Sequence, residues 1–354
     1  MQTLYASNVV RLTLIEEESK FYEASLPDFI WPTIEKLYQS IFFSEAHLRI
    51  NGSISKDTCA WVHRREGVIK ALLLFEREKR SVRVISEVIA LEKKDLAEFS
   101  KKIFKQYSDI TAIFFHAIKI NVLTLPTLPY WSQYIKFSED FILPLPESEE
   151  SWLRSLSKQT REKIRYHMRR SQRKHPDLKF HHASGSQISD AEFLSIIKMN
   201  RARMKIKGLK FGMDTAEENN LRALVRESGL LTMLKIEDKI CAGLLSTVCG
   251  KDVTMHVIAH DPAFDDLRPG FLCCCQTIQH CINQGMQRFH FLWGEYDYKT
   301  KLGGKREELM DLVIYKSIWH TVLHPRLVIK IWLGSLRQTY RNWRKKTQGV
   351  LHVR

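Results

Sequence analysis

The chain has 354 residues and is 44% hydrophobic, so it can bury two ordinary cores without help from disulfides. Its seven cysteines are odd in number and form no CxxC pair, which indicates a reducing compartment. We expect neither a secretory signal nor a membrane-spanning helix, because the start lacks a basic segment before an apolar run and no uncharged apolar stretch reaches about 18 residues. The expectation is a cytoplasmic protein.

The first half of the chain predicts three strands, a helix and a fourth strand. Apolar or alternating runs mark the strands at 59–63, 68–75, 82–91 and 112–118. Between the last two, residues 94–107 carry apolar side chains at helical spacing.

Residues 230–293 repeat that order of elements. Strands are expected at 231–236, 240–248, 253–259 and 288–293, with a helix at 270–283 before the last strand. A repeat of this kind indicates internal duplication of one α/β unit.

Prolines separate the two copies, and we place the boundary near residue 144, within the run 143–146. Helices are expected at 148–173 and at 190–205, the second with Asp190 as its N-cap and Gly208 just after its end.

The two copies differ where the third strand meets the helix. The second copy has a basic turn there, Arg268-Pro269-Gly270, at the start of the helix. Unpaired N–H groups, the helix dipole and a glycine make such a turn suitable for a pyrophosphate, although an ordinary turn is the alternative. The first copy has 89–95 at this place, without glycine, so we expect it not to bind the same ligand.

The formal net charge of +15 is concentrated in two segments. Residues 154–175 carry nine basic residues and one acidic residue, residues 316–354 carry nine basic and no acidic residues, and the rest of the chain sums to −2. In the first segment, four arginines recur every four residues: Arg161, Arg165, Arg169 and Arg173. This row is either a solvated face or a binding face for CoA phosphates, an acidic glycan or lipid head group, or RNA.

The second basic segment predicts an amphipathic helix that begins at Pro325. Its apolar face would contain Trp332, Leu336 and Trp343, with arginines and lysines mostly elsewhere. Such a helix suits an anionic membrane surface or packing on the domain.

Residues 148–316 resemble the acetyltransferase domain of the CelD/BcsL (BioF2-like) family, a branch of the GNAT superfamily. The resemblance rests on the order of a basic helix, two turns and two glycine-containing segments. These are Leu156-Ser157-Lys158 with Arg161, Ile164-Arg165 and Arg169-Arg170; Asp261-Pro262; Pro269-Gly270; Gly285; and Gly294-Glu295-Tyr296-Asp297-Tyr298-Lys299. The family pattern has aspartate where this chain has His290 and Glu295, and proline where it has Asp297.

The basic helix and the tandem of two similar units also resemble the FemABX aminoacyl-tRNA-dependent transferases. Together the resemblances imply an α/β fold with a mixed sheet, built as two tandem GNAT-like domains. We expect a degenerate domain at 1–144, an acyl-CoA-binding domain at 145–316 and a basic helical tail at 317–354.

The GNAT resemblance implies acetyl-CoA or another acyl-CoA as co-substrate, without a metal. It implies that Val257, Ile258 and Ala259 border the thioester and offer an N–H to its oxygen. Arg268, Gly270 and Phe271 would then hold the diphosphate.

An acceptor hydroxyl or amine must lose a proton, and Glu295 is the first candidate for the base, with Asp297 and His260 as competitors. Tyr298 would protonate the departing thiolate, and Lys299 would hold a phosphate or developing charge. The alternative for Tyr298 and Lys299 is an ordinary amphipathic segment, and for His260 a loop cap.

Three consecutive cysteines, 273–275, are expected to be small core residues, because neighbours on a helix point about 100° apart and cannot face one ligand together. The leading hypothesis is thus an acyltransferase, with an envelope or exopolysaccharide precursor as acceptor. A tRNA-dependent transferase and a non-catalytic binding module on the same fold are the alternatives.

Overall fold

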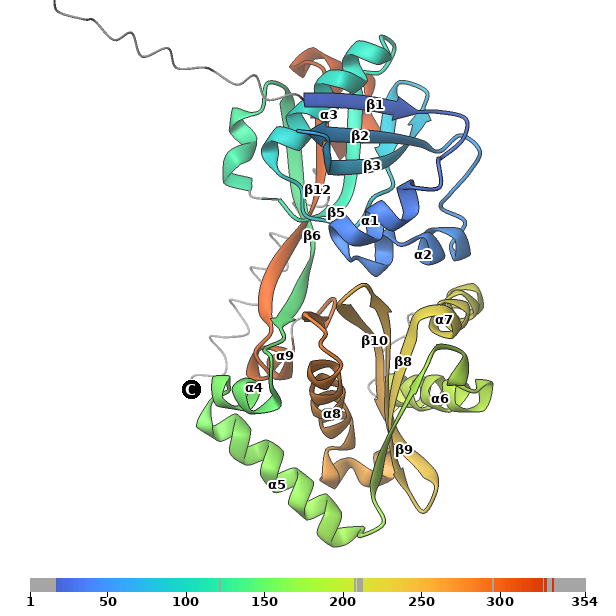
Figure 1. The fold of residues 1–354 in the computed structure, drawn as a ribbon, viewed down its shortest axis with the longest axis vertical. Coiled ribbons are helices and arrows are strands. Elements are labelled where there is room, and N and C mark those ends of the chain that lie inside the picture. The colour runs from blue at the N-terminus through green and yellow to red at the C-terminus, as the bar shows by residue number, and fades with distance from the viewer. Residues whose placement is uncertain are drawn as a thin grey trace, which may run out of the picture.

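The fold is mixed α/β, with a single twelve-stranded sheet that runs through the whole molecule (Figure 1). A computed structural model describes residues 17–120, 122–206, 208, 213–294, 296–326, 328–329 and 333. The strand order is β1-β2-β3-β4-β5-β12-β6-β11-β10-β9-β8-β7.

The first half forms one end of this sheet. Its strands are β1 (Glu17–Tyr22), β2 (Cys59–Arg65), β3 (Val68–Glu78), β4 (Ser81–Val84) and β5 (Ala112–Ile118), and its helices are α1 (Ile30–Tyr38), α2 (Glu45–Ile50) and α3 (Lys93–Gln106). Their apolar side chains form one core around Trp61, Phe75, Phe99 and Phe115. Edge-on contacts between these rings add directional packing to the buried apolar area.

Two long strands join the halves: β6 (Trp131–Pro144) and β12 (Lys305–Tyr315). They pair with each other along their length. β12 also pairs with β5 of the first half, and β6 also pairs with β11 of the second. In Figure 1 they run from the upper group of strands to the lower one. Each half therefore completes its sheet with a strand from the other half of the sequence.

The second half contains the strands β7 (Lys179–Ser184), β8 (Gly229–Ile236), β9 (Lys239–Cys249), β10 (Asp252–His260) and β11 (Arg288–His290). Its helices are α4 (Glu149–Ser155), α5 (Lys158–Lys174), α6 (Asp190–Ile206), α7 (Thr215–Ser228), α8 (Pro269–Asn283) and α9 (Asp297–Lys301). One core places α4, α5 and α8 on one face of the sheet, and a second core places α6 and α7 on the other.

The predicted repeat is present in the order and pairing of the elements. Strand, strand, strand, helix, strand occurs as β2-β3-β4-α3-β5 and again as β8-β9-β10-α8-β11. In both copies the third and fourth strands pair in parallel, and the helix connects them.

Three predicted elements need correction. The helix expected at 148–173 is two helices, because the extended Leu156 ends the first and the extended Ser157 caps α5 through the N–H of Thr160. β4 stops at Val84 and β11 at His290, both shorter than expected. Beyond β11, Leu292 takes a left-handed conformation (φ 53°), which interrupts the extended backbone.

Most of the predicted tail helix lies outside the described residues. Before the predicted start at Pro325, the tail contains a short 3-10 helix, Ile318–Leu323, in which Trp319 and Val322 are exposed. Among the residues that the structure describes, no helix is long and apolar enough to cross a membrane.

Candidate functional site

The strands β10 and β11 part after a short stretch of pairing, and this separation defines the candidate site. They pair through three residues each, ending at Thr254 and His290. β10 then continues to His260 beside β9, with a β-bulge between Met255 and Val257. The edge of β10 that would face β11 is therefore open beyond Thr254, and its backbone N–H and C=O groups need other partners.

The equivalent place in the first half is closed by backbone hydrogen bonds. Past β4 and β5 the two chains stay together: the N–H of Val88 donates to the carbonyl of Ala117 (3.0 Å) and that of Lys119 to Ile89 (2.8 Å). The N–H of Leu91 donates in turn to the carbonyl of Lys119 (3.1 Å). The first half thus lacks the open strand edge of the second.

A cavity of about 650 Å³ lies at the opening between β10 and β11. β10 lines it with 255–258, the loop after β11 with 291–293, and α6 and α7 form a further wall. Phe42 and His47, from the first half of the chain, contribute as well. The lining is largely apolar, with a few polar groups, as is usual for ligand sites.

Lys299 fixes the loop after β11. Its side chain is buried, and its Nζ donates to the carbonyls of Leu292 and Trp293, both at 2.7 Å. Burial lowers the pKa of Lys299 to about 8, so the ammonium form still predominates at neutral pH. The ammonium group compensates the two carbonyls that the turn at Leu292 leaves without strand partners.

Tyr298 lines the same cavity and is largely enclosed. Burial raises the pKa of its phenol well above the ordinary value, so the group keeps its proton throughout the neutral range. Asp297 is 91% exposed and pairs with Lys301 (3.3 Å) on the surface. Glu295 lies outside the described residues.

His260 lies at the end of β10, away from the residues that line the cavity. Its Nε2 is 2.5 Å from Asp265 Oδ1 in the turn that follows. The structure therefore does not bring His260 together with Tyr298 and Lys299.

The predicted phosphate turn begins α8. Arg268 is exposed and left-handed (φ 56°), and Gly270 is buried. A Cβ on Gly270 would lie 3.3 Å from Nδ1 of His260 and 3.7 Å from Cγ1 of Ile258. The glycine thus lets the first turn of α8 lie close against β10.

Several basic side chains lie beside this turn, and two of them, Arg170 and Lys174, pair with Asp266 of the turn (both 3.0 Å). Burial lowers the pKa of His167 on α5, and the nearby charges of Arg268, Lys163 and Arg170 lower it further. Positive charge and the start of a fifteen-residue helix lie together here, as an anionic group requires.

Four of the predicted site residues line the cavity: Val257, Ile258, Tyr298 and Lys299. Ala259, His260, Arg268, Gly270 and Phe271 lie beyond it, toward the start of α8. The two groups follow one another along β10 and the turn after it.

Among the polar residues of the cavity that sequence reasoning missed are Arg203, His256 and His47. Arg203 on α6 donates to the carbonyl of Ile258 (2.8 Å). His256 lies at the β-bulge and contacts Thr247 Oγ1 through Nε2 (2.8 Å). His47 belongs to the other half of the chain. His256 alone had a signal in the sequence, as a polar residue within an apolar strand.

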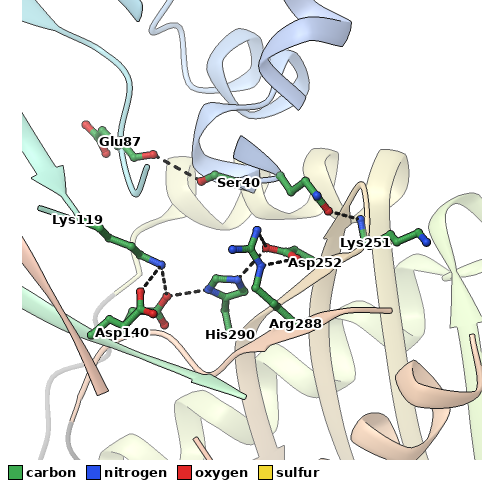
Figure 2. A network of polar contacts seen from close by, with 10 residues as sticks. Ser40, Glu87, Lys119, Asp140, Lys251, Asp252, Arg288 and His290 are labelled. Atoms are coloured by element: carbon green, nitrogen blue, oxygen red, sulfur yellow. Dashed lines mark hydrogen bonds and ion pairs between the residues drawn. The ribbon is translucent and has the colours of Figure 1, made fainter. Parts of the chain in front are cut away.

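A polar network lies at the junction of the halves (Figure 2). His290 is enclosed by two carboxylates, with Nδ1 2.7 Å from Asp140 Oδ2 and Nε2 3.0 Å from Asp252 Oδ2. Lys119 lies 3.5 Å from Asp140, and Arg288 lies 2.8 Å from Asp252. The network borders a second cavity, of about 410 Å³, between the two halves.

The described residues contain no group of three or more His, Cys, Asp or Glu side chains placed to hold a metal ion. The cysteines 273–275 are fully buried in α8, within the core.

Known proteins share this fold, and one family shares part of the sequence. Residues 158–300 match the family model of the acetyltransferase (GNAT) domain, which confirms the predicted resemblance. A structure of FemX has a TM-score of 0.63 at 12% identity, covering 86% of this chain and 99% of that one.

Two further structures are similar. A conserved protein of unknown function from Bacteroides thetaiotaomicron has a TM-score of 0.53 at 12% identity, over 84% of this chain and 99% of its own. L-PGS from Bacillus licheniformis has a TM-score of 0.50 at 14% identity, over 85% and 96%. At these identities the likeness shows the fold alone. No curated protein matches this chain in sequence.

Proposed function

We propose that the protein moves an acyl group from acyl-CoA to a hydroxyl or amine, because residues 158–300 match the family model of the acetyltransferase (GNAT) domain. The observation that carries the proposal is the open edge of β10 at a cavity of about 650 Å³. An extended thioester arm can pair with a strand edge that has no neighbouring strand.

A donor for the thioester oxygen is available on that edge. The carbonyl of Ile258 accepts a hydrogen bond from Arg203 on α6, away from β9. Because the N–H and C=O of one strand residue point to the same side, the N–H of Ile258 faces the opening too. A fixed N–H there would stabilise the oxyanion that forms during acyl transfer.

The start of α8 supports a site for the diphosphate. Arg268 and the first turn of α8 follow directly from the open strand, and α5 adds positive potential. A ligand that enters along β10 would meet these groups after the thioester position. Arg268, Gly270 and Phe271 are the residues that we assign to it.

Proton transfer is divided among the residues after β11. The phenol of Tyr298 carries a proton at neutral pH, and we assign it to the departing thiolate, for which its raised pKa makes it a weak acid. Lys299 holds the loop through two carbonyls, so its contribution is to position the cavity wall. Glu295 remains the predicted base, with Asp297 and His260 as its competitors.

We further propose that the halves are two GNAT-like units, with domains at 1–144 and 145–316 that exchange strands β6 and β12. The repeated order of elements supports this. Two further points are proposals. The basic tail, 317–354, would contact an anionic membrane, and the acceptor would be an envelope or exopolysaccharide precursor.

Calorimetric titration with acetyl-CoA tests the function. We expect the wild type to bind it and Arg268→Glu to bind at least tenfold more weakly, because the charge beside the diphosphate is reversed. Lys93→Glu, at the start of the corresponding helix of the first half, is the control and should bind normally. Equal affinity of all three proteins would contradict the assigned site.

A FemABX-like, aminoacyl-tRNA-dependent transfer is the second candidate. The exposed arginines of α5, among them Arg165, Arg169 and Arg173, favour it, because a row of cations suits a polyanion. Its affinity for tRNA should fall steeply between 50 and 200 mM salt, by about 10³-fold for six phosphate contacts. A flat salt dependence, or no tRNA binding, would exclude the tRNA-dependent transfer and favour the acyl-CoA reaction. A non-catalytic module would bind acetyl-CoA or longer acyl-CoA and transfer nothing.

A further inference from the structure

His256 lines the cavity, but the proposed reaction assigns it no role. It lies at the β-bulge of β10, next to Val257, and its side chain lines the cavity at the strand opening. The bulge follows directly after Thr254, the last residue of β10 that pairs with β11. Bulges are a common means of aiming a side chain into an active site.

The contacts of His256 fix one ring nitrogen and leave the other available. Nε2 lies 2.8 Å from Oγ1 of Thr247, a fully buried residue on β9. Nδ1 has no hydrogen-bond partner among the described residues. It is not among the fully buried polar atoms without a partner, so a molecule in the cavity can reach it. The distance between Nε2 and Thr247 Oγ1 is compatible with either ring tautomer. In the tautomer that carries the proton on Nε2, Nδ1 presents its lone pair to the cavity.

The charged groups of the cavity are already engaged by the protein. Arg203 donates to the Ile258 carbonyl, and Lys299 to the loop carbonyls. Glu217 caps α7 by accepting from the N–H of Asp214 (2.9 Å). Among the described lining residues this leaves His256 and the neighbouring His47 of α2 as the nitrogen bases.

Both histidines are neutral at physiological pH. Burial lowers the pKa of His256 to about 4, and the proximity of His47 acts in the same direction. Burial likewise lowers the pKa of His47 to about 4. A neutral imidazole that lines the cavity can accept the proton of an acceptor hydroxyl as this hydroxyl attacks.

We propose that His256 is a catalytic base that acts through Nδ1 on a neutral alcohol or sugar hydroxyl in this cavity. The inference rests on the proposed acyl transfer and narrows its acceptor class. The hydroxyl oxygen forms a bond to the thioester carbon while its proton passes to Nδ1. The carbon–sulfur bond then breaks, and the thiolate takes the proton of Tyr298 or of the imidazolium.

Because His256 is a weak base, the proton transfer is expected to follow most of the bond formation between oxygen and carbon. A base of low pKa takes up the proton only as the oxygen bonds to carbon and the hydroxyl becomes acidic. The contact between Nε2 and Thr247 Oγ1 holds the ring in its orientation, and the proposed role takes the tautomer with the proton on Nε2.

The experiment measures release of CoA thiol from acetyl-CoA by the full chain, with water alone and with glycerol as hydroxyl acceptors. We expect His256→Gln to lower turnover about 100-fold or more, the usual contribution of a general base, with unchanged affinity for acetyl-CoA by calorimetry. Added imidazole should restore turnover to His256→Ala, above the background measured with wild type plus imidazole.

His182→Gln is the matched control. His182 also contacts a threonine, with Nδ1 3.0 Å from Thr232 Oγ1, and burial lowers its pKa to about 4, but it lies on β7 outside the cavity. It should retain wild-type turnover. Circular dichroism and melting temperature establish that each variant folds, and His256→Asn is the second variant if glutamine does not fit.

Each other outcome has a defined meaning. Wild-type turnover in His256→Gln, or loss of turnover that imidazole does not rescue, would overturn the assignment of His256. Turnover lost in Glu295→Gln but kept in His256→Gln would give the role to Glu295. A wild type that binds acetyl-CoA but acylates neither acceptor would overturn the hydroxyl class. A wild type that does not bind acetyl-CoA would remove the proposed function itself.

Discussion

Nδ1 of His290 on β11 lies 2.7 Å from Oδ2 of Asp140 on β6, and both side chains are buried at the junction of the two halves. Its other ring nitrogen faces Asp252 at 3.0 Å. With a carboxylate at each ring nitrogen, both nitrogens donate, so His290 is an imidazolium. Burial disfavours this charge, but the hydrogen bonds to Asp140 and Asp252 raise the pKa of His290 above its ordinary value.

This arrangement predicts a pH-dependent stability. A raised histidine pKa stabilises the fold fully below the unfolded-state pKa of about 6.5, and this contribution is lost as pH rises through the folded-state value. The pKa of Asp140 is held below its usual value, because the hydrogen bond and charge of His290 outweigh its burial. That contribution is present above about pH 4 and is lost in stronger acid.

We expect His290→Gln to lower the free energy of unfolding by about 1.5–3 kcal/mol at pH 6, because two buried carboxylates lose a charged hydrogen-bond donor while Lys119 and Arg288 remain beside them. The difference from wild type should shrink toward pH 9. Urea denaturation across pH 5–9 measures it, with His182→Gln as the control whose imidazole bonds to threonine. A difference that grows with pH would contradict the imidazolium.

Lys299→Met should weaken both the fold and acyl transfer. The substitution keeps a side chain of similar length but removes the ammonium group that donates two 2.7 Å hydrogen bonds. The carbonyls of Leu292 and Trp293 then lose this donor. The expected loss of unfolding free energy is about 1.5–3 kcal/mol. Turnover of acetyl-CoA should fall because the cavity wall loosens.

Lys301→Met, two residues away, is the control. Lys301 is 55% exposed, and its ion pair with Asp297 lies on the surface. Its loss should change stability little. Equal effects of the two substitutions would show that Lys299 has no special role.

The thiols of the folded protein should be unreactive. All seven cysteines are buried, and burial raises the pKa of Cys249 and Cys281 to about 12. Thiolate is the reactive form, so the native chain should consume far less than one equivalent of a thiol reagent in minutes, and seven after denaturation. Rapid native labelling of any cysteine within 273–275 would contradict the packing of α8.

The sequence predicted the elements well where the apolar pattern was local. The repeat, the strand at 112–118 and the helix α8 follow from residue patterns within one element. The break between α4 and α5 was missed although Ser157 carried a cap signal, because the basic run continued across it. β6 was missed because prolines at both ends suggested a linker.

The site was harder to predict because its walls come from distant segments. Val257, Ile258, Tyr298 and Lys299 were identified by resemblance to a family, and the structure places them at one cavity. Phe42 and His47 reach the same cavity from about two hundred residues away, where their segment packs against α7 and β9. No pattern within either segment indicates that contact.

Hydrogen exchange with mass spectrometry, with and without acetyl-CoA, tests the central claim most directly, because it observes the backbone N–H groups of β10 themselves. Acetyl-CoA should slow exchange at 255–260 and 268–272 and leave 85–95, the corresponding segment of the closed first half, unchanged. Protection at 85–95 instead, or none at 255–260 with acetyl-CoA bound, would contradict the placement of the thioester on the open edge of β10.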